Sequence, residues 1–135
     1  MKGVKLFLIL EGLSSLEIKE LKKAVQSPLY NTNERLLYLY EALRKQHPIF
    51  PNTTAFKEKI FKKTFPAEPF NDQKLRRIFS HLREVTEQFL IHQQINQDKF
   101  RKEKLLAAAY KERRLFDFYK TKTEQLVQQI EAHPC

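Results

Sequence analysis

The chain contains very little glycine and no tryptophan, since Gly3 and Gly12 are its only glycines. Glycine supplies the backbone conformations that tight hairpins and phosphate-binding loops need, so few of either can form here. The segment from Asp72 to His133 contains neither glycine nor proline. Because these two residues are the main breakers of local structure, their absence predicts helix over this length. We therefore expect an all-α protein.

Cysteine and long apolar runs are also scarce. The only cysteine is Cys135, so no disulfide can form within the chain, which favours a reducing compartment and a cytoplasmic location. The apolar run at residues 6–10 is ended by Glu11 and is too short to cross a bilayer. It also lacks the small-residue cleavage site of a secretory signal. We expect it to form a core helix, and we expect no membrane association.

The charge is strongly basic, with 25 Lys and Arg against 16 Asp and Glu and a net charge of +9. Such a balance favours acidic partners, including nucleic acid. The excess is spread along the chain, because residues 1–70 carry 12 basic and 7 acidic side chains and residues 71–135 carry 13 and 9. With 41% hydrophobic residues, the 135-residue chain has enough apolar surface for a single folded domain, residues 1–135.

Capping residues and apolar spacing predict a bundle of short helices in residues 1–70. Ser14 with Glu17 forms the pattern of a capping box, and Asn31 or Asn33 suits the start of the third helix, which ends at His47-Pro48. The four expected helices span Lys5–Gly12, Ser15–Gln26, Glu34 to about residue 46, and Thr54–Thr64. Their expected buried residues are Ile18, Leu21, Val25, Leu36, Leu37, Tyr40, Leu43, Phe56, Ile60 and Phe61.

Residues 71–133 predict a long helical segment that begins after the cap Asn71. Its first apolar stripe comprises Leu75, Ile78, Leu82, Val85 and Phe89. The stripe then loses phase, and two later sets comprise Phe100, Leu105, Ala109 and Tyr110, and Leu115, Phe118 or Tyr119, Leu126 and Ile130. We expect breaks near 96–98 and 113–115, because one unbroken helix of this length is rare. The whole chain then has six or seven helices in antiparallel pairs, as a helical bundle or a helical repeat.

No pattern of residues indicates catalysis or metal binding. His81 and His92 are about three helical turns apart and cannot chelate one ion, and there is no His-Glu-x-x-His sequence. No Ser-His-Asp or Cys-His set and no phosphate-binding fingerprint is present. We therefore expect no enzyme activity, no catalytic residue, no cofactor, no metal and no small-molecule substrate.

Two stretches, residues 56–83 and residues 99–114, concentrate positive charge. In the first, Arg76 and Arg83 share a helix face and follow a short helix and a tight turn, as in helices that read the major groove. The alternative is an ordinary solvated face on two helices. If nucleic acid binds, Arg76 and Arg83 are the candidate base readers, and the candidate phosphate contacts are Lys57, Lys62, Lys63, Lys74 and Arg77.

Three aromatic side chains, Tyr38, Phe116 and Phe118, lie off the main predicted apolar stripes or at their edge. Exposed aromatic residues are common anchors of protein interfaces, so these three are the candidate interface residues. The first hypothesis for function is a non-enzymatic helical interaction module that binds a protein partner or itself, or the N-terminal part of a helical-repeat protein. The alternative is a nucleic-acid-binding regulator that uses the two basic stretches.

Four strings of residues are similar to a group of long, all-helical bacterial proteins that have no assigned activity. The strings are Ser15-Leu16 with Glu20-Leu21, Ser27-Pro28-Leu29-Tyr30-Asn31-Thr32-Asn33-Glu34, Lys59-Ile60-Phe61-Lys62-Lys63-Thr64-Phe65-Pro66, and Pro69-Phe70-Asn71-Asp72-Gln73-Lys74-Leu75-Arg76. The resemblance covers most of residues 12–130. It implies a helical module at the head of a longer helical array.

A second, weaker resemblance is to winged-helix regulators that precede helical repeats in some bacterial transcription activators. It is carried by Leu75-Arg76 and by Ser80-His81-Leu82-Arg83. The glycine-rich wing hairpin of those regulators has no counterpart here, since the helical pattern continues instead. This resemblance implies a helix-turn-helix geometry and leaves DNA binding open.

Overall fold

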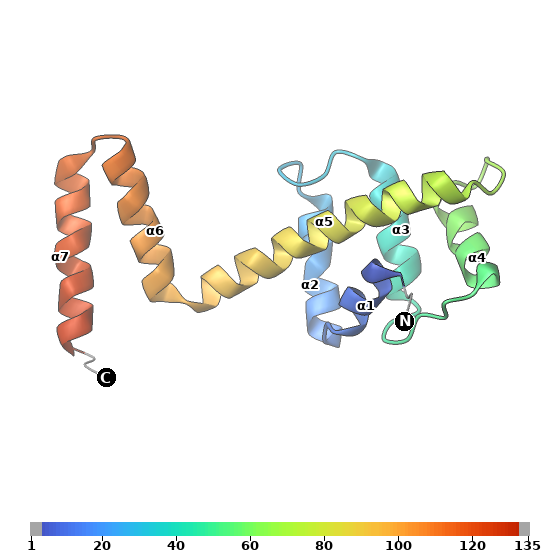
Figure 1. Ribbon diagram of the computed structural model, residues 1–135, viewed down its shortest axis with the longest axis horizontal. Coiled ribbons are helices and arrows are strands. Elements are labelled where there is room, and N and C mark those ends of the chain that lie inside the picture. The colour runs from blue at the N-terminus through green and yellow to red at the C-terminus, as the bar shows by residue number, and fades with distance from the viewer. Residues whose placement is uncertain (1–3, 133–135) are drawn as a thin grey trace. The chain divides into compact units, whose positions relative to one another are not determined.

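The computed structural model describes residues 4–132, and these form seven α-helices and no strand (Figure 1). The all-α class is therefore as predicted. The chain divides between Phe89 and Leu90 into two compact parts, here named the N-terminal unit (residues 4–89) and the C-terminal unit (residues 90–132). The helices are α1 (Lys5–Glu11), α2 (Ser15–Gln26), α3 (Glu34–Arg44), α4 (Thr54–Thr64), α5 (Asp72–Gln97), α6 (Lys99–Glu112) and α7 (Phe116–Ala132).

Side-chain caps fix where the helices of the N-terminal unit begin. The Ser14 hydroxyl accepts from the Glu17 backbone N–H at 3.1 Å, and the Glu17 carboxylate accepts from the Ser14 N–H at 2.9 Å. This is the predicted capping box. Of the two candidate caps for α3, Asn33 is the one used, and it accepts from the Arg35 N–H. Asn31 instead donates its amide to the Val25 carbonyl at 2.8 Å, which holds the connection against the end of α2.

Helices α2, α3 and α4 run alternately up, down and up, and each packs against the next (Figure 1). The Tyr40 hydroxyl on α3 donates to the Ile18 carbonyl on α2 at 2.5 Å, and burial raises the pKa of Tyr40 above its ordinary value. The predicted stripe of α3 is correct at Leu36, Tyr40 and Leu43, but Leu39 is fully buried and Leu37 only half-buried. The α3 sequence has apolar residues on more than half of its circumference, and its neighbours decide which of them are covered.

An aromatic cluster joins α1 to the rest of the N-terminal unit. The ring of Phe7 lies 5.4 Å from Phe50, 5.7 Å from Phe56 and 5.3 Å from Phe79, measured between ring centroids. These residues come from α1, the loop before α4, α4 itself and α5. Apolar residues 6–10 are thus part of a core helix, as the sequence predicts, and α1 closes one side of the unit.

The C-terminal unit is built around an antiparallel hairpin of α6 and α7 (Figure 1). Both predicted breaks are observed, since α5 ends at Gln97 and α6 ends at Glu112. Asp98 caps α6 by accepting from the Arg101 N–H at 3.0 Å. Its carboxylate also favours the positive end of the helix dipole.

The turn between α6 and α7 uses arginine where glycine is usual. Arg114 has φ 57°, the left-handed conformation that ends many helices. Its N–H donates to the Lys111 carbonyl at 3.0 Å, and the Leu115 N–H donates to the Tyr110 carbonyl at 2.9 Å. These two bonds are those of a Schellman motif, so the backbone pairing is satisfied although the residue is not glycine.

Replacing Arg114 with glycine is expected to stabilise the hairpin by about 0.5–1 kcal/mol, because glycine adopts positive φ without steric cost. The measurement is native-state hydrogen exchange of the α6 and α7 amides, which should slow in Arg114→Gly. Arg113→Gly is the matched control, since Arg113 has φ −91° and glycine there gains nothing. Equal protection in the two variants would contradict a strained Arg114.

Candidate functional site

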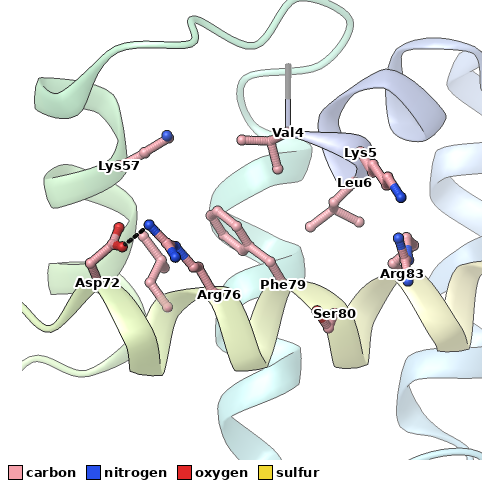
Figure 2. A pocket seen from close by; sticks show the side chains of 10 residues that line it. Val4, Lys5, Leu6, Lys57, Asp72, Arg76, Phe79, Ser80 and Arg83 are labelled. Atoms are coloured by element: carbon pink, nitrogen blue, oxygen red, sulfur yellow. Dashed lines mark ion pairs between the residues drawn. The ribbon is translucent and has the colours of Figure 1, made fainter. Parts of the chain in front are cut away.

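The N-terminal unit has an open groove between α1, α4 and α5, with a volume of about 320 Å³ (Figure 2). Its floor is apolar, and its rim carries the charged side chains. The floor residues are Val4, Leu6, Leu75 and Phe79, and the polar residues are Lys5, Lys57, Asp72, Arg76, Ser80 and Arg83.

The backbone of α5 places two guanidinium groups along the groove. Arg76 and Arg83 are seven positions apart, which is two helical turns and roughly 10 Å along the axis, so they share a face. Phe79 lies between them and points into the groove, toward Val4 and Leu6 of the α1 side (Figure 2). Lys57 extends from α4 toward the same space (Figure 2). The groove is thus cationic on three of its sides and apolar beneath.

Positive charge predominates in the groove, because four of its side chains are cationic and Asp72 is the one carboxylate that lines it. Arg76 Nη2 lies 2.7 Å from Asp72 Oδ2, so this carboxylate is already paired. Arg83 differs, since its Nε is buried and has no hydrogen-bond acceptor among residues 4–132. The nearest carboxylate oxygen, Glu87 Oε1, is 3.9 Å away, which is too long for a hydrogen bond. Buried donors normally have a partner, so Arg83 is a group with unused capacity.

Three of the seven candidate nucleic-acid contacts, Lys57, Arg76 and Arg83, meet at this groove. Lys62, Lys63 and Arg77 are exposed and do not line it. Lys74 is engaged elsewhere, since its ammonium pairs with Glu68 and lies 4.6 Å from the centre of the Phe65 ring. The sequence interpretation missed Lys5, because periodicity within one helix does not reveal which distant helix will face it.

A second candidate surface is the α6–α7 hairpin, which buries very little of its apolar surface. Among the described residues of the C-terminal unit only Ala107 and Leu126 are buried. Much of the two later apolar sets is therefore at the surface. The large exposed side chains of the hairpin are 39–60% exposed, and they are Leu105, Leu106, Leu115, Phe116, Phe118, Val127 and Ile130.

The three candidate interface residues are exposed, as an interface requires. Phe116 and Phe118 begin α7, and the Phe118 ring contacts Tyr110 of α6 with centroids 5.5 Å apart. Tyr38 belongs to α3 of the N-terminal unit, where the Arg35 guanidinium lies 5.4 Å from its ring centre. The structure thus assigns the three residues to two different units.

Polar contacts hold the seam of the hairpin. Lys122 Nζ lies 2.5 Å from Glu103 Oε2, and this hydrogen bond lowers the pKa of the Glu103 carboxyl below its ordinary value. Lys111 lies over the ring of Tyr119 at 5.7 Å. Ion pairs of this kind align two helices but add little stability. Because these polar contacts lie between α6 and α7, the large apolar side chains of the two helices lie outside this contact.

Residues 4–132 contain no group of three or more His, Cys, Asp or Glu side chains that could hold a metal ion. Of the helices described, none is long and apolar enough to span a membrane. No protein-family model, curated protein or solved structure matches this chain. The class that the structure defines is an all-α protein with a cationic groove in one unit and an exposed apolar hairpin in the other.

Proposed function

We propose that this chain is a non-enzymatic helical protein-interaction module and that the α6–α7 hairpin is its docking surface. The observation that carries the proposal is that the hairpin has many large apolar side chains and buries very few of them. Seven large apolar residues are exposed while only Ala107 and Leu126 are buried. Soluble proteins rarely leave so many neighbouring apolar side chains in water unless a partner covers them.

The low stability expected for an isolated pair of helices supports this proposal. Isolated helices of this length are marginal in water, and most helix stability in proteins comes from the packing of an apolar face. The hairpin supplies one buried leucine and one buried alanine for that purpose. Covering the exposed leucine, valine, isoleucine and phenylalanine side chains would contribute about 1.5–3 kcal/mol for each one fully buried. A docking partner therefore supplies the stability that the hairpin lacks.

A second copy of the same hairpin is the occupant that fits its charge. Helix α6 carries five basic and two acidic side chains, whereas α7 carries two basic and three acidic ones. In a two-fold symmetric pair, α6 of one copy can pack against α7 of the other, which brings opposite charge excesses together. Two antiparallel hairpins joined in this way form a four-helix bundle. We therefore propose that the chain self-associates through α6 and α7.

The test uses the full chain with Phe116→Glu and Phe118→Glu combined. Sedimentation equilibrium should show a concentration-dependent dimer for the natural sequence at about 10–100 µM and a monomer for the variant, since buried unpaired carboxylates strongly oppose association. Both positions are exposed and lie in the first turn of α7, where acidic residues favour the helix dipole. Neither position belongs to the N-terminal unit, whose fold is expected to tolerate the change.

The matched control is Leu16→Glu combined with Leu29→Glu. These leucines are 63% and 79% exposed, lie in the N-terminal unit, and give the same change of charge. The control should still dimerise. A natural chain that stays monomeric over this range, or a control that dissociates as fully as the α7 variant, would show that the hairpin is not a self-association surface.

A further inference from the structure

We propose that the groove between α1, α4 and α5 binds an acidic peptide segment of a partner protein, with carboxylates that flank an apolar side chain. This inference goes beyond the proposed function, because it concerns the N-terminal unit and does not depend on the hairpin. It rests on three features of the groove: its excess of cations, the partly exposed guanidinium group of Arg83, and its apolar floor.

The charges of the groove complement an acidic ligand. Asp72 already pairs with Arg76 at 2.7 Å, and Arg83 has only a long ion pair of 3.9 Å with Glu87, which does not line the groove. Lys5 and Lys57 have no carboxylate partner among the groove residues. Arginine binds a carboxylate through two parallel hydrogen bonds, and the Arg83 side chain is 32% exposed, so part of its guanidinium group is accessible from the groove. An incoming carboxylate would bind this exposed part of the guanidinium group.

The spacing of the cations along the groove suits two carboxylates of one peptide. Arg76 and Arg83 are separated by roughly 10 Å along α5, from the rise of the helix. Arg76 pairs with Asp72 through Nη2, but its side chain is 79% exposed and its other guanidinium N–H groups can still donate to a ligand. Extended chain advances about 3.3 Å per residue, so two acidic residues three positions apart span this distance. The two residues between them would then lie over the middle of the groove.

The floor of the groove is apolar, since Phe79 lies between the two arginines and the buried Leu75 directly precedes Arg76. Leu6 and Val4 complete the apolar surface from the α1 side (Figure 2). An apolar side chain placed there leaves water and adds hydrophobic free energy to the charge contacts. Nucleic acid would gain little from this floor, because its phosphates follow exposed rows of cations and read bases from projecting side chains. The concave, apolar-floored groove therefore favours a peptide.

The test measures binding of fluorescein-labelled Glu-Glu-Leu-Phe-Glu-Glu to the full chain by fluorescence anisotropy. Two peptide controls separate the contributions: Gln-Gln-Leu-Phe-Gln-Gln lacks the charge, and Glu-Glu-Ser-Ser-Glu-Glu lacks the apolar side chains. Each control should bind at least about tenfold more weakly, since one charge-assisted hydrogen bond or one buried side chain is worth that much. A single-stranded DNA of about 12 nucleotides and its duplex are tested alongside.

The matched protein variants both remove two positive charges. Lys57→Gln with Arg83→Gln changes groove residues, whereas Lys62→Gln with Lys63→Gln changes exposed lysines of α4 outside the groove. We expect the first variant to weaken the acidic peptide at least about tenfold and the second to change its binding less than about threefold. Ser80→Trp is a further variant, because Ser80 is exposed on α5 and a tryptophan there would fill the groove.

Four results would overturn this assignment, and the last concerns Ser80→Trp. One is the absence of binding by the acidic peptide at low salt. Another is an equal loss of binding in the two charge variants, which would mean that only the overall charge of the chain is sensed. The third is that the DNA binds more tightly than the peptide and is lost with the same groove substitutions, which would assign the groove to phosphate groups of nucleic acid. Unchanged peptide binding in Ser80→Trp would place the peptide elsewhere.

Discussion

Replacing Phe7 with alanine lowers the free energy of unfolding of the N-terminal unit by about 3–5 kcal/mol, the usual range for removing a core phenylalanine. The ring is 2% exposed and touches Phe50, Phe56 and Phe79, which come from three different segments. Its removal leaves a cavity at the point where α1 meets α4 and α5. Since a domain of this size is stable by only about 5–15 kcal/mol, the loss is a large share of the total.

Leu8→Ala is the control for this substitution. Leu8 lies next to Phe7 on α1 but is 49% exposed, so its removal should change stability by less than about 1 kcal/mol. Both changes introduce alanine into the same helix, and helix propensity therefore cannot explain a difference between them. Urea unfolding followed by circular dichroism gives the two midpoints. Coinciding midpoints would show that α1 is not anchored through Phe7.

The starts of the N-terminal helices were predictable because their signals are local. Ser14 with Glu17 and the threonine Thr53 specify their helix starts through hydrogen bonds that span only three residues. A cap of this kind is specified by residues close in sequence, so it can be predicted without the tertiary structure. For this reason α2 and α4 begin at the residues that the sequence predicts.

The groove was predictable only in part, because it depends on how distant helices meet. Arg76 and Arg83 share a helix face by spacing alone, and the sequence interpretation identified them together. It also placed Lys57 in the same basic stretch, but it included Lys62, Lys63 and Arg77, which lie outside the groove. Nothing local indicates that Lys5, more than fifty positions before Lys57, belongs to the same site. The position of Lys5 at the groove depends on tertiary contacts between α1 and α5, which the apolar periodicity of a single helix does not predict.

The turn at residues 113–115 shows the opposite case, in which the location was predictable and the conformation was not. The change of apolar phase indicates a break there, and α6 ends at Glu112. The left-handed conformation falls on Arg114, a residue with no preference for it. The Schellman bonds to Lys111 and Tyr110 hold this conformation at the C-terminal end of α6.

The fragment of residues 98–135 is expected to lose most of its helix at low concentration when it is cut from the rest of the chain. Its two helices bury only Ala107 and Leu126 between them, and the Glu103–Lys122 ion pair adds little. The conformational entropy of ordering each residue costs about 1–2 kcal/mol, which so small a core does not offset. The fragment of residues 1–97 is the control, because it retains the buried residues of the N-terminal unit, from Leu6 to Thr86. It should show helical circular dichroism and a cooperative thermal transition.

The concentration dependence of the helix content of the 98–135 fragment distinguishes helix formed by association from helix that is stable in a single copy. Helix that grows with concentration, from about 1 µM to several hundred µM, indicates that copies cover one another's apolar side chains, because association is governed by mass action. Helix that is complete at the lowest concentration and melts cooperatively would mean that the hairpin is stable by itself. In that case the exposed residues Leu106, Phe116 and Phe118 would not require a partner, and the inference from their exposure to a docking surface would fail. The same samples with Phe116→Glu and Phe118→Glu should remain unfolded throughout, because a carboxylate cannot be buried unpaired against a second hairpin.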